Sequence, residues 1–246
     1  AGTPSGGLTK SGAGALTIAG SSTYTGATII TNGQLIVSNT ASYNSPTTIH
    51  SGTKMSWTGN ATVQNNNTVA FTLNSGGTLE NLNPANWTVI NEPVTCSGTT
   101  TINQKSNATG SGNEGFFLDG GLKGSGTCTI TADNAGSGVN CRNNNSTFGG
   151  TLIVNGIAST TAFAGSGIGV GGCTTGLQNS DITLNGTMEL LNQGIGWANP
   201  ASGAFAMGGL SGTGVMVANF TGGGGTTVTL GYNNRNGSFS GTIANG

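Results

Sequence analysis

The 246-residue sequence predicts an all-β protein built as a solenoid, and three observations support this. Gly accounts for 47 residues and charged residues for only 5% of the chain, a composition that disfavours helix interiors. Hydrophobic residues make up 34%, and they alternate with Thr, Ser and Asn in short runs typical of half-buried strands. Sequence phrases also recur along the chain, which indicates stacked strand-and-corner units rather than a compact sandwich.

The hydrophobic runs predict strands of about 3 to 6 residues. In chain order they lie at 16–18, 69–73, 130–131, 152–154, 182–184 and 228–230. Clusters of Gly and Asn separate them, and both residue types tolerate the positive φ of tight corners. Nothing in composition or charge divides the chain, so we expect one domain over residues 1–246. At about 18 to 25 residues per coil, the chain would hold about ten to thirteen coils.

Two phrases repeat most clearly. Gly-Gly-Leu followed by spaced glycines and a short hydrophobic strand occurs at 6–18, 120–130 and 208–217. An aromatic residue followed by Gly and then Ile occurs at 24–29 and 148–153, with a shortened copy at 239–243. Each phrase combines a corner with a strand, as expected for one part of a coil.

Residues 12–37 resemble the passenger-associated repeat of bacterial autotransporters. The pattern of that family reads G-x-G-x-L-T-L-x-G-x-N-T-Y-T-G-x-T-x-I-x-x-G-x-L-x-V. The match is nearly complete over 12–37 and partial over 120–156 and 205–246. The resemblance implies a single-stranded right-handed parallel β-helix, located outside the cell or on the bacterial surface. It selects no activity, because such passengers include adhesins, enzymes and stalks.

The four cysteines form an even set in a chain that resembles exported proteins, which favours disulfides. Cys128 occupies the repeat position of Leu16, and Cys141 shares a strand face with Val139, so both are expected to point inward. We therefore expect bridges between Cys128 and Cys141 and between Cys96 and Cys173. The alternative is that the cysteines are buried thiols acting as small hydrophobes.

Several classes of ligand are not expected. The formal net charge is −1 and no basic run occurs, which argues against a nucleic-acid partner. No apolar run approaches the length of about 20 residues that a membrane-spanning helix needs, so no helical membrane insertion is expected. His50 is the only histidine and no Cys-x-x-Cys pair exists, so we expect no metal site. No cofactor is expected, because the Gly-x-Gly-x-x-Gly at 167–172 is not followed by a helical pattern.

An enzyme is the next alternative, because parallel β-helices often degrade polysaccharides with clustered carboxylates. Such chemistry needs at least two carboxyl groups at a defined separation. No two acidic residues lie within four positions of each other, although Asp119 and Asp133 would meet across neighbouring coils, with Arg142 nearby. We expect these carboxylates to be solvated corner residues and the protein not to be an enzyme.

A carbohydrate-binding adhesin is a further alternative. Aromatic side chains stack on sugars, and the three tryptophans, Trp57, Trp87 and Trp197, are the candidates. Trp87 and Trp197 stand in Asn- and Pro-containing segments, which resemble binding loops.

The sequence favours a structural extracellular rod that binds to itself. Solenoids normally hide their terminal coils under caps, and neither end of this sequence resembles one. The last residues also read into the first like two halves of one repeat. We therefore expect head-to-tail stacking through Leu8 and Leu16 at one end and Phe239 and Ile243 at the other. Such contacts do not close and form a fibre. The rival explanation is that the 246 residues are one section of a longer repeat protein.

Overall fold

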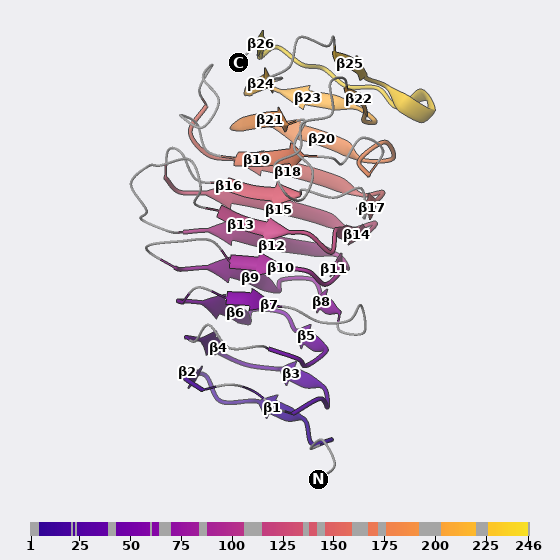
Figure 1. Cartoon of the computed structure of the whole chain (residues 1–246). Coiled ribbons are helices and arrows are strands. Elements are labelled where there is room, and N and C mark those ends of the chain that lie inside the picture. The colour runs from indigo at the N-terminus through magenta and orange to yellow at the C-terminus, as the bar shows by residue number, and fades with distance from the viewer. Residues whose placement is uncertain are drawn as a thin grey trace.

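Short strands stack on one another along a single axis, so that the chain forms a parallel β-solenoid (Figure 1). In this computed structural model the pairings among the described strands are all parallel, and the described residues form no α-helix. The structure describes residues 5–20, 22, 24–38, 43–59, 61–63, 70–83, 88–105, 115–134, 138–141, 146–158, 167–171, 176–191, 203–219 and 226–245. All-parallel pairing follows from the coil geometry, because each circuit brings the chain back in the same direction.

The strands belong to three long sheets and one short sheet, which we name A to D. Sheet A contains β1 (Leu8–Lys10), β3 (Thr28–Ile30), β5 (Thr47–Ile49), β8 (Phe71–Leu73), β11 (Val94–Cys96), β14 (Leu122–Gly124) and β17 (Thr147–Phe148). Sheet B contains β2 (Ala15–Ile18), β4 (Gln34–Val37), β6 (Lys54–Trp57), β9 (Thr78–Asn81), β12 (Thr99–Gln104), β15 (Thr127–Ala132), β18 (Thr151–Asn155), β20 (Asp181–Leu184) and β23 (Leu210–Gly212). Sheet C contains β7 (Ala61–Val63), β10 (Thr88–Ile90), β13 (Gly115–Leu118), β16 (Gly138–Cys141), β19 (Gly167–Gly171), β21 (Thr187–Leu191), β24 (Val215–Asn219) and β26 (Thr242–Asn245). Sheet D contains β22 (Gly203–Ala206) and β25 (Thr226–Thr229), and a short 3₁₀ turn covers Tyr232–Asn234.

The path of the chain changes along the rod. Between β7 and β19 the chain visits sheets C, A and B in turn, so each circuit adds one strand to each sheet. Near the N-terminus it goes from sheet B to sheet A, from β2 to β3 and from β4 to β5, and no described residue in between pairs in sheet C. Beyond β21, the strands of sheet D follow those of sheet C.

Hydrophobic columns run along the inside of the solenoid. Strand residues alternate between the two faces of a sheet, so every second side chain points inward. One column in sheet B joins register partners from successive strands: Leu16, Leu35, Met55, Leu79, Ile102, Ile130, Val154 and Leu184. From Leu35 onward these side chains are fully buried. The core is therefore one continuous stripe, which each coil extends by a few side chains.

The predicted strands are confirmed where the structure describes them. The described part of sheet B has nine strands, and a parallel bridge between Gly212 and Phe239 adds one further level beyond β23, close to the lower end of the predicted number of coils. Members of the sheet B column lie closest in sequence between β2, β4 and β6, and furthest apart between β18 and β20. Later coils therefore use more residues than the first ones. Cys128 points inward as predicted, yet Ile130 is the residue that shares the column of Leu16.

Candidate functional site

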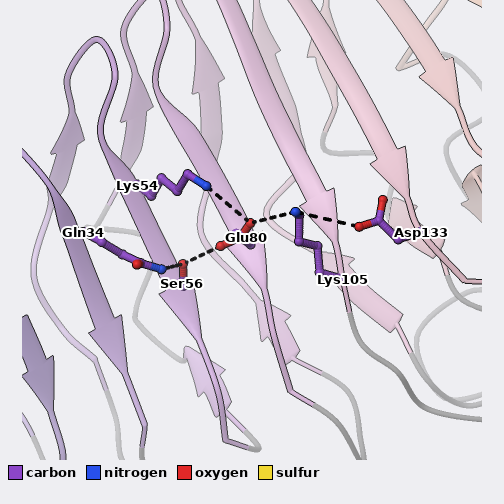
Figure 2. A network of polar contacts seen from close by, with 6 residues as sticks. All are labelled: Gln34, Lys54, Ser56, Glu80, Lys105 and Asp133. Atoms are coloured by element: carbon purple, nitrogen blue, oxygen red, sulfur yellow. Dashed lines mark hydrogen bonds and ion pairs between the residues drawn. The ribbon is translucent and has the colours of Figure 1, made fainter. Parts of the chain in front are cut away.

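A ladder of polar side chains crosses neighbouring coils on the outward face of sheet B (Figure 2). The Gln34 side-chain amide donates to Ser56 Oγ at 2.9 Å, and Ser56 Oγ donates to Glu80 Oε2 at 3.0 Å. Ser56 and Glu80 are register partners on β6 and β9, so their side chains leave the sheet one above the other. Outward positions therefore carry this polar ladder, while the flanking inward positions carry the core.

Charged groups continue the ladder. Lys54 Nζ and Lys105 Nζ lie 4.0 and 3.9 Å from Glu80 Oε1, and Lys105 Nζ lies 3.8 Å from Asp133 Oδ2. Lys105 and Asp133 directly follow β12 and β15, and the backbone N–H of Asp133 donates to the backbone carbonyl of Gln104 at 3.1 Å. The same end of successive sheet B strands thus presents acid, base and acid in sequence.

Burial separates Glu80 from the other charges. Its side chain is only 4% exposed, whereas those of Lys54, Lys105 and Asp133 are 48%, 41% and 45% exposed. A buried carboxylate needs compensating donors and charges. Ser56 and the two lysines supply them, so this arrangement ties three successive coils together.

The predicted acid pair is corrected by this geometry. Asp119 follows β13 of sheet C and is buried, whereas Asp133 follows β15 of sheet B and forms its ion pair with Lys105. The carboxylate that shares a base with Asp133 is Glu80, and Arg142 lies outside the described residues. Sequence reasoning missed Glu80 because it lies two coils before Asp133; its outward position in an alternating strand was the available signal.

The tryptophan prediction is wrong for Trp57. This side chain is fully buried in the core, and its ring centroid lies 5.9 Å from those of Phe71 and Phe116. A ring enclosed on the inner side of the coils has no face for a sugar. Trp87 and Trp197 lie outside the described residues.

A tyrosine–threonine pair repeats in the first coils, and only its first copy was visible in the sequence motif. Tyr24 and Thr28 hydroxyls lie 2.9 Å apart, and those of Tyr43 and Thr47 lie 2.8 Å apart. The two tyrosine rings meet edge to face with centroids 6.5 Å apart. Burial raises the pKa of the Tyr43 phenol well above its ordinary value. The segment from Tyr43 therefore repeats the local tyrosine–threonine arrangement of the segment from Tyr24.

The predicted bridge between Cys128 and Cys141 is absent from the structure. Cys96, Cys128 and Cys141 are buried thiols, and an interaction with Cys128 lowers the pKa of Cys96. Cys173 lies outside the described residues, so its predicted pairing with Cys96 stays a prediction. Among the described residues no group of three or more His, Cys, Asp or Glu side chains is placed to hold a metal ion.

The end coils expose side chains that the columns bury elsewhere. Leu16 is 39% exposed, although the next member of its column, Leu35, is fully buried. Ile243 on β26 is 60% exposed. Leu8 and Phe239 are partly buried and pack against the core. The four residues predicted for assembly therefore lie on the first and last described coils, two of them with much of their surface open.

The fold and these features define a charge-poor parallel β-solenoid with apolar end coils. Residues 8–37 match the family model of the passenger-associated-transport-repeat, which confirms the resemblance of this segment to autotransporter passengers. The matched residues run from β1 to β4 and so span two coils. Neither curated proteins nor solved structures gave a match. The repeat implies a secreted or surface-exposed protein, and no helix among the described residues is long and apolar enough to cross a membrane.

Proposed function

We propose that the chain is a structural segment of an extracellular β-helical rod whose copies stack head to tail into a filament. The observation that carries the proposal is the exposure of inward-type apolar side chains on both end coils, Leu16 at one end and Ile243 at the other. A further coil stacked on either end would remove this apolar surface from water, as each coil does for its neighbour.

Hydrogen bonding supports the same contact. Within the described residues β1 and β2 pair on one side only, with β3 and β4, and β26 pairs only with β24. The unpaired edges of these strands present donors and acceptors that a strand of a neighbouring copy can satisfy.

The two ends also match in the order in which the chain visits the three sheets. Through the middle of the rod the order of sheets is C, then A, then B. β26 lies in sheet C, while β1 and β2 lie in sheets A and B. The last strand of one copy and the first two strands of the next therefore have the order of a single coil. The contact joins two different surfaces, so it repeats without closing.

The test uses one charge at each end. Leu16→Lys and Ile243→Lys place an ammonium group where the proposal buries a side chain, and each alone should abolish filaments in electron micrographs. Ile157→Lys is the matched control, because Ile157 is 49% exposed but follows β18 in the middle of the rod. It should assemble like the unmodified chain.

Mixing the two end variants sharpens the test. Leu16→Lys keeps an intact C-terminal coil and Ile243→Lys an intact N-terminal coil, so an equimolar mixture should give dimers, but no filaments, in sedimentation velocity. An unmodified chain that stays monomeric at high concentration would contradict assembly of separate copies. So would a native polypeptide several times longer than this sequence whose own coils cover both ends.

A polysaccharide-degrading enzyme is the second candidate, and one observation favours it. Oxygens of Glu80 and Asp133 lie 3.9 and 3.8 Å from the same Lys105 Nζ, so this one ammonium group bridges the two carboxyl groups. The separation of these two oxygens cannot exceed the sum of the two distances. It is therefore below the largest separation known for the carboxyl pairs of glycosidases, about 9.5 Å. The near-complete burial of Glu80 weighs against this candidate, because a catalytic carboxyl group must reach the sugar.

A further inference from the structure

Segment 226–245 forms the C-terminal end of the rod (Figure 1), and none of its described side chains is fully buried. It joins the rest of the rod through backbone pairing: β26 pairs with β24, and Phe239 bridges to Gly212 at the end of β23. Terminal segments with little apolar burial open locally at a low cost in free energy. Polar contacts to earlier coils therefore matter more here than in the middle of the rod.

One charged side chain of this segment reaches past a neighbouring coil. Arg235 Nη1 donates to Asp181 Oδ2 at 2.5 Å, although Asp181 begins β20, which lies below β23 in sheet B. The coil between them contains Gly208, whose backbone N–H donates to the Ser180 carbonyl at 3.0 Å and whose carbonyl accepts from the Gly231 N–H at 2.8 Å. The ion pair therefore ties the last coil to the second coil before it.

The intervening coil leaves room for this contact. A Cβ on Gly208 would lie 2.6 Å from Arg235 Cδ, so the arginine side chain passes where any other residue would place its own side chain. The backbone N–H of Gly209 donates to Asp181 Oδ1 at 3.2 Å, which leaves the second carboxylate oxygen for the arginine. The two glycines thus open the path and orient the acid.

The turn before Arg235 has an unusual backbone. Asn233 and Asn234 have φ of 59° and 58°, the only positive values among the non-glycine residues that the structure describes. A left-handed conformation costs free energy for a residue with a Cβ, and it persists where surrounding contacts hold it. The Asn233 side-chain amide donates to the side-chain oxygen of Asn179, two residues before Asp181. The same corner of the earlier coil therefore holds this turn at two points.

We propose that the ion pair of Arg235 with Asp181 is a clamp that positions β26 for the head-to-tail contact. The proposal rests on the proposed function, in which Ile243 of β26 meets the first coil of the next copy. A binding surface that is closed for only part of the time binds more weakly in proportion to that fraction. The paired side chains are 34% and 46% exposed, so each effect of removing the clamp should be moderate.

Hydrogen exchange tests the clamp apart from assembly. In the Leu16→Lys background, which should stay monomeric, Arg235→Gln or Asp181→Asn should speed exchange of the β26 amides by about two- to fivefold. Asp181→Asn keeps an oxygen that accepts from the Gly209 N–H, so it removes the charge alone. The double variant should exchange like either single variant, because both changes remove one contact. Unchanged exchange in β26, or increases that add in the double variant, would overturn the clamp.

Asp133→Asn is the matched control. Asp133 is 45% exposed and pairs with Lys105 in the middle of the rod, so its ion pair is similarly solvated but remote from the last coil. This variant should leave exchange in β26 unchanged. Faster exchange in β26 would show that the loss of any surface ion pair has the same effect, and the clamp would be refuted.

The mixture of end variants shows where the clamp acts. Its dimer uses the C-terminal coil of Leu16→Lys and the N-terminal coil of Ile243→Lys. Arg235→Gln added to Leu16→Lys should weaken the dimer by about two- to fivefold in sedimentation velocity, whereas the same change added to Ile243→Lys should leave it unaltered.

Three other outcomes of this mixing experiment count against the proposal. Weakening from either partner would mean that the substitution damages the whole rod, and weakening from neither would remove the positioning role. A parent mixture without dimers would overturn the proposed function together with that role. The exchange result would still decide whether Arg235 and Asp181 hold the last coil closed.

Discussion

Glu80 shows how a residue at an outward position of a solenoid can hold neighbouring coils together. It lies at an outward strand position, yet its carboxylate is almost fully enclosed and accepts from Ser56 while two lysines approach its second oxygen. Solvated ion pairs contribute little, because water screens them and their side chains lose entropy. Glu80 differs because removing its charge leaves two ammonium groups facing a buried neutral group.

The ladder gives a prediction at the scale of the residue. Glu80→Gln should lower the free energy of unfolding by about 1–2 kcal/mol, because the amide keeps a contact to Ser56 but no longer attracts the lysines. Asp133→Asn, at the exposed end of the same ladder, should cost less than about 0.5 kcal/mol. Urea denaturation measures both. Polysaccharide breakdown that depends on Asp133 would instead favour the enzyme.

The sequence predicted which way many side chains point but not which of them meet. Strand alternation was enough to predict that the side chains of Cys128 and Cys141 point inward, because the face that a side chain occupies depends only on its position along its own strand. Contacts between coils depend on coil length, and that length changes from one step of the sheet B column to the next. Glu80, Lys105 and Asp133 come from three successive coils of unequal length, so their ladder was not readable from spacing.

Corners between strands differ in how tightly they are packed, even where their glycines have similar positive φ angles. Gly33 directly precedes β4, and Gly52 precedes β6 with one residue between them; their φ angles are 73° and 71°. A Cβ on Gly33 would lie 2.5 Å from the carbonyl oxygens of Gly12 and Gly14, whereas one on Gly52 would meet nothing within 4 Å. The first corner therefore needs Gly for both conformation and space, and the second for conformation alone.

These two glycine corners give a prediction at the scale of the element. Gly52→Ala should cost about 1–2 kcal/mol, the penalty of a left-handed residue with a side chain. Gly33→Ala adds a steric conflict with the preceding coil and should cost about 2–4 kcal/mol. Chemical denaturation compares the two directly. Equal costs would mean that the loop at Gly12 moves aside without penalty.

Repeated phrases predicted strands well but did not place every copy on the same sheet. The phrases at 6–18 and 120–130 each begin in sheet A and continue in sheet B. The phrase at 208–217 begins in sheet B and continues in sheet C. A strand and its corner are local, whereas the sheet that a strand joins depends on how much chain precedes it in the coil. Longer coils before β23 shift the third copy by one sheet.

The filament gives a prediction at the scale of the whole molecule. Sheet B has nine described strands and one further level where Phe239 bridges to Gly212, so each copy should advance a head-to-tail filament by about 48 Å, at about 4.8 Å per level. Layer lines in electron micrographs or fibre diffraction should show this repeat together with the strand spacing. A repeat near twice that length would indicate copies that alternate in direction, and the head-to-tail arrangement would then be wrong.

The short coils near the N-terminus have a mechanical consequence. Among the described residues no sheet C strand precedes β7, and the first steps of the sheet B column span fewer residues than any later step. The rod is therefore thinner at that end, and resistance to bending falls steeply as the cross-section of a rod decreases. In a filament of stacked copies every junction would include such a waist, and flexure would concentrate there at regular intervals. The fibre would then behave as a chain of stiff segments, with hinges whose spacing equals the length of one copy.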